Sequence, residues 1–102
     1  MRIISRKRLR QYGKLHPDAE ASLTSWYMVV KNAKWTTFNE LAGTIKSVDP
    51  VKVSSGAVVS VFNIAHNRHR LIAHFHFDKQ RVFVLRIMTH KEYGKDKWKE
   101  EL

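Results

Sequence analysis

The sequence contains no cysteine, only two prolines and four glycines, and only nine acidic side chains among its 102 residues. Without cysteine, disulfides, thiolate zinc sites and cysteine catalysis are excluded, and the chain suits a reducing cytoplasm. No apolar stretch approaches the roughly 20 residues that a membrane helix requires. The basic start MRIISRKRLR is not followed by an apolar region. We therefore expect a cytoplasmic protein with neither a membrane anchor nor a secretory signal.

Positive charge is the strongest compositional feature. Nineteen lysines and arginines give a formal net charge of +10. Such an excess on a small chain indicates a polyanionic partner, and nucleic acid is the first candidate. An anionic membrane surface is the alternative, but no segment is basic on one side and continuously apolar on the other. The hydrophobic fraction of 43% is typical of a globular protein, so we expect one domain over residues 1–102.

The first half of the chain has helical patterns. Residues 1–4 are short and apolar and predict a strand, after which Ser5 fits the N-cap of a basic helix that ends near Gly13 and residues 16–17. Apolar residues then recur at three- and four-residue spacing over a second helix, from residue 17 to about residue 31. Thr37 and Glu40 fit a capping box that opens a third, short helix. Residues 49–50 mark a break.

The second half changes to a period of two. An antiparallel meander after N-terminal helices indicates an α+β fold, with those helices packed on a small, mainly antiparallel sheet. The predicted strands are residues 51–53, 58–64, 68–77 and 81–88, joined by turns at 54–56, 66–67 and 78–80.

Alternation along the last two strands predicts which side chains face the helices. It places Arg70 and Arg86 together on the open side of the sheet. Two arginines on one open face can form a phosphate clamp, because each guanidinium gives bidentate hydrogen bonds to an anion. The expected helix-facing set is Leu71, Phe75, Phe83 and Ile87, with Val82 and Val84 on the open side.

Residues 85–93, LRIMTHKEY, concentrate groups that transfer protons or bind anions where a strand ends. Side chains at the end of a rigid strand are held in place while remaining exposed. Arg86, His90 and Tyr93 are therefore candidate site residues. The same stretch also reads as a helix start, with Thr89 as N-cap and Glu92 three residues later. The two interpretations are compatible, because capping leaves His90 and Tyr93 free.

Six histidines raise the question of a metal. His74 and His76 lie on one face of a strand, and His90 would be the third ligand of a zinc site. No carboxylate obviously completes this set, because Asp78 falls in a turn. We therefore expect no metal and no cofactor.

Three motifs, in order, carry a resemblance to a known family. They are Val61-Phe62-Asn63-Ile64, Asn67-x-x-Arg70-Leu71-Ile72 and Arg86-x-x-Thr89-His90-x-Glu92-Tyr93. With them, the chain resembles the HigB family of bacterial toxins, which belong to the RelE-like superfamily of ribosome-dependent mRNA endonucleases. The likeness covers nearly the whole chain. It departs from the family at Ala65 and His66, where glycines are frequent, at His69, where an aromatic residue is common, and at Gly94, where an aspartate commonly stands.

The resemblance implies a toxin that cuts mRNA in the ribosomal A site without a metal, by driving the RNA 2′-hydroxyl onto the adjacent phosphate. Its implied partners are mRNA, the ribosome with its ribosomal RNA, and a HigA antitoxin with a helix-turn-helix region. By motif position, Arg70, His90 and Tyr93 fall where the family's active-site residues are expected, and Arg86 falls beside them, so these four are the expected catalytic residues. We also expect Asn67, Arg68, Lys91, Lys95 and Lys97 to bind RNA, because basic side chains grip its backbone.

Two other functions fit the same residues less well. A non-catalytic, basic RNA-binding module would use the same sheet face but does not need His90 and Tyr93 beside two arginines. A relative with the same fold that poisons gyrase is less favoured, because this chain has candidate catalytic residues at Arg70, Arg86, His90 and Tyr93.

Overall fold

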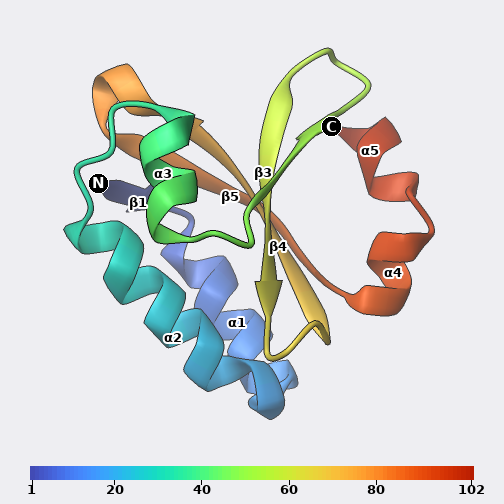
Figure 1. Cartoon of the computed structure of the whole chain (residues 1–102). Coiled ribbons are helices and arrows are strands. Elements are labelled where there is room, and N and C mark those ends of the chain that lie inside the picture. The colour runs from blue at the N-terminus through green and yellow to red at the C-terminus, as the bar shows by residue number, and fades with distance from the viewer.

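Five strands form one mixed sheet in the computed structural model, which describes residues 1–102 (Figure 1). The spatial order is β1-β5-β4-β3-β2. The first strand runs parallel to β5, and all other neighbours are antiparallel. The strands are β1 (Arg2–Ile4), β2 (Asp49–Lys52), β3 (Val58–Ile64), β4 (His69–His76) and β5 (Arg81–Thr89).

The helices lie on both sides of this sheet, which confirms the α+β prediction (Figure 1). Three precede the meander and pack on one face, and two short ones follow β5 on the other side. None of them combines the length and the apolar character that crossing a membrane requires. The helices are α1 (Arg6–Leu15), α2 (Pro17–Asn32), α3 (Phe38–Thr44), the 3-10 turn η1 (Phe77–Lys79), α4 (His90–Gly94) and α5 (Lys97–Glu101).

The predicted helix starts are correct in position and partly correct in chemistry. Pro17 is the first residue of α2, where its missing N–H has no acceptor to lose. Ser5 precedes α1 in a left-handed conformation, with φ of 77°, and its side chain makes no capping hydrogen bond. The Thr37 hydroxyl accepts from Glu40 N at 3.2 Å, as predicted. The Glu40 carboxylate, however, reaches back to Thr36.

The main core fills the space between the sheet and α1–α3. Apolar residues recur at helical spacing in α2 and on alternate positions of β4, and both sets are buried here. Its buried members include Leu23, Trp26, Leu41, Phe62 and Leu71.

A β-bulge overturns part of the predicted face assignment. Ile72 pairs with Arg86, but Ala73 pairs with Val84, so Leu85 is an extra residue in β5. One extra residue reverses the side to which the strand's residues point. Ile87 therefore lies on the helix side as predicted, whereas Val82 and Val84 also face the helices and Phe83 faces the other way.

The face expected to be open carries a second, smaller core. Trp98 of α5 is buried against Val59, Ile72 and Met88. The sequence did not predict a helix in the basic tail after residue 95. Helix α5 has 5 residues and only one buried side chain, that of Trp98, so it shows no apolar periodicity. Arg70 and Arg86 share this face, as predicted, but α4 and α5 partly cover it.

Strand β2 begins at Asp49 and contains Pro50, which we expected to break the chain. Pro50 pairs with Ser60 of β3, and β2 is an edge strand. A proline is tolerated there because an edge strand needs ladder hydrogen bonds on one side only.

We predict that Trp98→Ala lowers the free energy of unfolding by about 3–5 kcal/mol, because it empties the second core. Chemical denaturation followed by circular dichroism measures this. The neighbouring exposed substitution Lys97→Ala is the control and should change stability by less than about 0.5 kcal/mol. A loss below about 1 kcal/mol for Trp98→Ala would mean that α5 does not stabilise the sheet.

Candidate active site

The turn between β3 and β4 is held in an unusual conformation. Ala65, His66 and Asn67 have φ values of 52°, 55° and 81°, all in the left-handed region. Each such residue other than glycine is disfavoured by about 1–2 kcal/mol. The Ser22 hydroxyl of α2 accepts from Ala65 N at 3.2 Å and ties the turn to the helical layer. The turn is therefore strained, and its backbone orientation is fixed.

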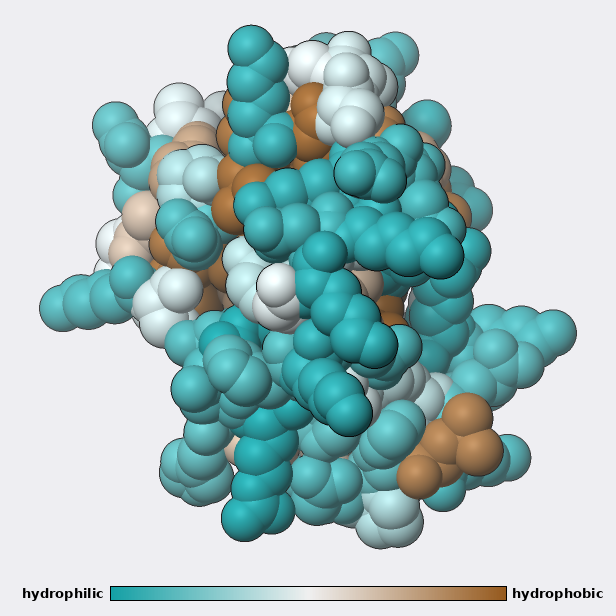
Figure 2. Space-filling view, turned by 90° about the vertical axis from the view of Figure 1, so that its right-hand side faces the viewer, coloured by the Kyte–Doolittle hydropathy of each residue, from teal (hydrophilic) through white to brown (hydrophobic).

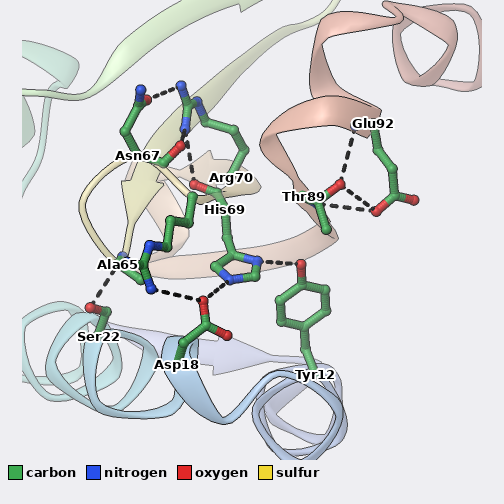
Figure 3. A network of polar contacts seen from close by, with 10 residues as sticks. Tyr12, Asp18, Ser22, Ala65, Asn67, His69, Arg70, Thr89 and Glu92 are labelled. Carbon is green, nitrogen blue, oxygen red and sulfur yellow. Dashed lines mark hydrogen bonds and ion pairs between the residues drawn. The ribbon is translucent and has the colours of Figure 1, made fainter.

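Arg70, the second residue of β4, is the centre of the candidate site (Figure 3). Its Nη1 donates to the carbonyls of Asn67 at 3.0 Å and His69 at 3.1 Å, and its Nη2 donates to Asn67 Oδ1. Only 8% of the residue is exposed, although we expected an exposed side chain. The strained turn thus supplies two of the acceptors that a buried guanidinium requires, both from Asn67.

His90 meets Arg70 from the other side of the site. Its Nδ1 lies 3.1 Å from Arg70 Nη2, and its backbone N donates to Arg68 O at 2.8 Å. A guanidinium only donates, so Nδ1 accepts, and the neutral ring carries its proton on Nε2. The capping box of Thr89 and Glu92 is present as predicted and starts α4 at this point. His90 itself is exposed, also as predicted.

Tyr93 lies one turn further along α4. Its ring is 5.3 Å from the Arg70 guanidinium carbon and stacks on Trp98 at 5.2 Å. Burial and, to a lesser degree, the charge of Asp49 raise the pKa of the Tyr93 hydroxyl, while Lys99 and Arg70 oppose them. The hydroxyl therefore stays protonated at neutral pH. The ring of Tyr93 packs against Arg70 and Trp98, so the hydroxyl is the part of this side chain that can interact with a ligand.

We call Asn67, Arg70, His90 and Tyr93 the Arg70 cluster. Arg86 makes no hydrogen bond to the residues of the Arg70 cluster. Its Nη1 donates to Leu85 O at 3.0 Å.

Arg86 instead lines a neighbouring groove of about 350 Å³ with Lys95, Lys97 and Trp98. The acidic residues Glu92 and Glu101 also line it. The molecule is mostly hydrophilic on the side of α4 and α5 (Figure 2). Arg68, Lys91, Lys95 and Lys97 are all exposed.

A second polar network joins the helices to the start of β4 (Figure 3). His69 is 4% exposed, with Nε2 2.8 Å from Asp18 Oδ2 and Nδ1 2.7 Å from the Tyr12 hydroxyl. The Asp18 carboxylate only accepts, so Nε2 of His69 carries a proton and donates it to this hydrogen bond. Burial, with the charges of Glu92 and Asp18, raises the pKa of Tyr12 to about 12. Sequence reasoning missed this network, although alternation places His69 on the same face as Leu71.

One set of side chains in the structure is close enough together to hold a metal ion. It differs from the set His74, His76 and His90 that the sequence suggested. Ligand atoms of His16, Asp18 and His69 all lie within 4.8 Å of one another. Both ring nitrogens of His69 are already used in hydrogen bonds. His74 and His76 are neighbours, with ring centroids 4.8 Å apart, but His90 does not join them.

The chain is similar in sequence to known bacterial toxins. Residues 19–96 match the HigB_toxin family, described as the RelE-like toxic component of a toxin-antitoxin system. The mRNA interferase HigB of Escherichia coli O6:H1 (strain CFT073) is 30% identical over 95 residues, covering 93% of this chain and 90% of that protein. The mRNA interferase toxin HigB of Escherichia coli K12 is 26% identical over 93 residues, covering 91% of this chain and 88% of that protein.

We predict that Asp18→Asn lowers the melting temperature at pH 7. The hydrogen bond from His69 is the main cause that lowers the pKa of Asp18 below its ordinary value of 3.8. A carboxyl with a lowered pKa in the folded state stabilises the protein above the unfolded pKa and loses this effect as pH falls through the folded one.

The difference between wild type and variant should therefore shrink as the pH falls below 3.8. Thermal unfolding from pH 7 to pH 2 measures it. Asp78→Asn, at an exposed carboxylate in η1, is the control. A difference that stays constant down to pH 2 would show that the ionised form of Asp18 is not what stabilises the fold.

Proposed function

This chain belongs to the HigB family of RelE-like toxins, and from that membership and the Arg70 cluster we propose that it is a ribosome-dependent mRNA endonuclease. The observation that carries the proposal is the 3.1 Å contact between Arg70 Nη2 and His90 Nδ1, with Tyr93 against the same guanidinium. RNA cleavage through the 2′-oxygen needs a base, a cation that stabilises the phosphate charge and an acid, and His90, Arg70 and Tyr93 can fill these three roles.

The first step is exchange of hydrogen bonds at Arg70. All four Nη hydrogens are engaged in the free protein, one of them with His90. A phosphate oxygen is a stronger acceptor for a guanidinium than a neutral imidazole. When the scissile phosphate binds Arg70, it releases His90 Nδ1. The base thus becomes free only when the phosphate is in place.

Cleavage then follows by proton transfer. His90 Nδ1 removes the proton from the 2′-hydroxyl, and the 2′-oxygen attacks the phosphorus. Arg70 stabilises the charge that builds on the non-bridging oxygens. The bond to the 5′-oxygen breaks, and that oxygen takes a proton from the Tyr93 hydroxyl. The products are a 2′,3′-cyclic phosphate and a 5′-hydroxyl end, and no metal or cofactor takes part.

The remaining site residues hold the cluster or the RNA. Asn67 gives Arg70 two of its acceptors, so it positions the guanidinium. Arg86 and the exposed Lys95 and Lys97 grip the RNA backbone from the neighbouring groove. Such phosphate contacts provide affinity without sequence choice.

The proposed partners follow from the family and from the charge. A toxin of a toxin-antitoxin system is neutralised by an antitoxin, here a HigA-type protein with a helix-turn-helix region. The net charge of +10 favours docking on ribosomal RNA, where the toxin reaches mRNA in the A site. The proposed place of action is the bacterial cytoplasm.

We predict that His90→Ala reduces cleavage by about 100–1000-fold, because it removes the proton acceptor. Arg70→Lys keeps the charge but loses the planar fork and should lose a similar amount. The measurement is primer extension on ribosome-bound mRNA, with a chelator present and magnesium limited to what ribosomes need.

Lys79→Ala removes an exposed cation in η1 and should cut at the wild-type rate. Circular dichroism confirms folding, since Arg70 is buried. Wild-type cutting by folded His90→Ala and Arg70→Lys would place the active site elsewhere and favour a binding module. If the chelator abolishes cutting by the wild-type protein and added zinc or manganese restores it, the metal-free mechanism is contradicted.

Tyr93→Phe should lower the cleavage rate by about 10–100-fold, because the ring contacts survive and only the proton donor is lost. A substrate with a 5′-thio leaving group needs no proton on departure. On that substrate, the variant and the wild type should cut at similar rates. An equal loss on both substrates would mean that Tyr93 binds RNA and does not act as the acid.

A further inference from the structure

Two histidines and an aspartate meet where the helical layer joins the sheet. His16 connects α1 to α2, Asp18 lies in the first turn of α2, and His69 is the first residue of β4. The ligand atoms of these three residues lie within 4.8 Å of one another. Two imidazoles and one carboxylate are a ligand set that proteins use for zinc, with the fourth position left to water.

His16 has a fixed backbone and unused ring nitrogens. Its backbone N donates to Tyr12 O at 2.8 Å and its carbonyl accepts from Ala19 N at 2.9 Å, so both helices hold it. Its ring stacks on that of Tyr12, with centroids 4.2 Å apart, and meets the ring of His69 edge-on at 5.2 Å. Neither ring nitrogen makes a hydrogen bond, and the residue is half-buried. A metal ion therefore gains a nitrogen ligand here without breaking an existing hydrogen bond.

His69 already faces the partners that a zinc-bound histidine needs. Its Nε2 lies 2.8 Å from Asp18 Oδ2, and its Nδ1 lies 2.7 Å from the Tyr12 hydroxyl oxygen. A histidine that binds a metal through one nitrogen usually donates the proton on its other nitrogen to a nearby acceptor. With zinc on Nε2, the remaining ring proton lies on Nδ1 and the Tyr12 oxygen accepts it. The proton displaced from Nε2 goes to Nδ1 of a neutral ring, or to solvent from a charged one.

Only small movements close these ligands around an ion. Zinc bonds of about 2.0–2.1 Å at tetrahedral angles hold neighbouring ligand atoms about 3.3 Å apart. His69 Nε2 and Asp18 Oδ2 must therefore separate by about 0.5 Å, and no ligand pair has to close by more than about 1.5 Å. Asp18 is exposed, which gives the ion a path from solvent. Arg68 lies 3.9 Å from Asp18 Oδ2, but its side chain is 72% exposed and is free to turn away.

We propose that His16, Asp18 and His69 bind one zinc ion, which fastens the corner between α1 and α2 to the start of β4. Calcium and magnesium do not fit, because they prefer oxygen ligands. The ion takes no part in cleavage, since the side chain of His69 contacts the helices whereas that of Arg70 contacts His90. The proposal is therefore independent of the proposed function.

The test measures zinc binding by the whole purified chain, without a histidine tag and after treatment with a chelator. Calorimetry should give one zinc ion per chain. Zinc should also raise the melting temperature by about 5 °C or more, because an ion that binds only the folded state stabilises it. Cobalt(II) in place of zinc should give the intense visible absorption of a four-coordinate site.

Three variants assign the ligands. His16→Gln removes one ligand, and we expect zinc affinity to fall on the order of 100-fold and the rise in melting temperature to disappear. Tyr12→Phe keeps the ring but removes the acceptor for the His69 proton, and should weaken zinc binding about tenfold. His76→Gln is the matched control, because it removes a histidine of the other pair and should leave zinc binding unchanged. Thermal unfolding without metal confirms that each variant is folded.

Three outcomes would overturn the proposal. A wild-type chain that binds no zinc at a large excess of the ion has no such site. Zinc binding that His16→Gln leaves unchanged is adventitious. Loss of zinc binding in His76→Gln, with wild-type affinity in His16→Gln, would place the ion at the histidine pair of β4. None of these measurements uses RNA cleavage, so a chain that binds zinc as expected but never cuts counts against the proposed function alone.

Discussion

A buried arginine is the constraint on which the site depends. A guanidinium removed from water is tolerated only when its hydrogens find acceptors. Arg70 finds them in three places that are separate in the chain: the turn before β4, its own strand, and the helix after β5. The charge therefore links the left-handed turn to α4, and neither can move without leaving donors unpaired.

The two elements that meet at Arg70 are fixed by different means. The turn is held against local preference, with three non-glycine residues at positive φ and a hydrogen bond to Ser22. Helix α4 follows local preference, because Thr89 and Glu92 form a reciprocal capping box where β5 ends. The box sets where the helix starts, and this start places His90 beside Arg70 and Tyr93 one turn further on.

Sequence reasoning succeeded where local rules decide and failed where distant contacts do. The helical spacing in α2, the alternation in β4 and the capping box at Thr89 were predicted correctly. The bulge at Leu85 was not, since alternation reports direction within one strand and not the pairing between two. The burial of Arg70, the His69 network and the docking of Trp98 depend on residues far apart in the chain, and no local pattern records them.

The sheet divides the chemistry of this toxin between its two faces. Its helix side is occupied by the main core. Its other side carries Arg70, Arg86 and the smaller core around Trp98. Arg86, Lys95 and Lys97 line one groove on this side and repel one another, and a bound polyanion would relieve that repulsion. The larger core therefore lies on the face away from the Arg70 cluster, and the face that carries the cluster is only partly covered, by α4 and α5.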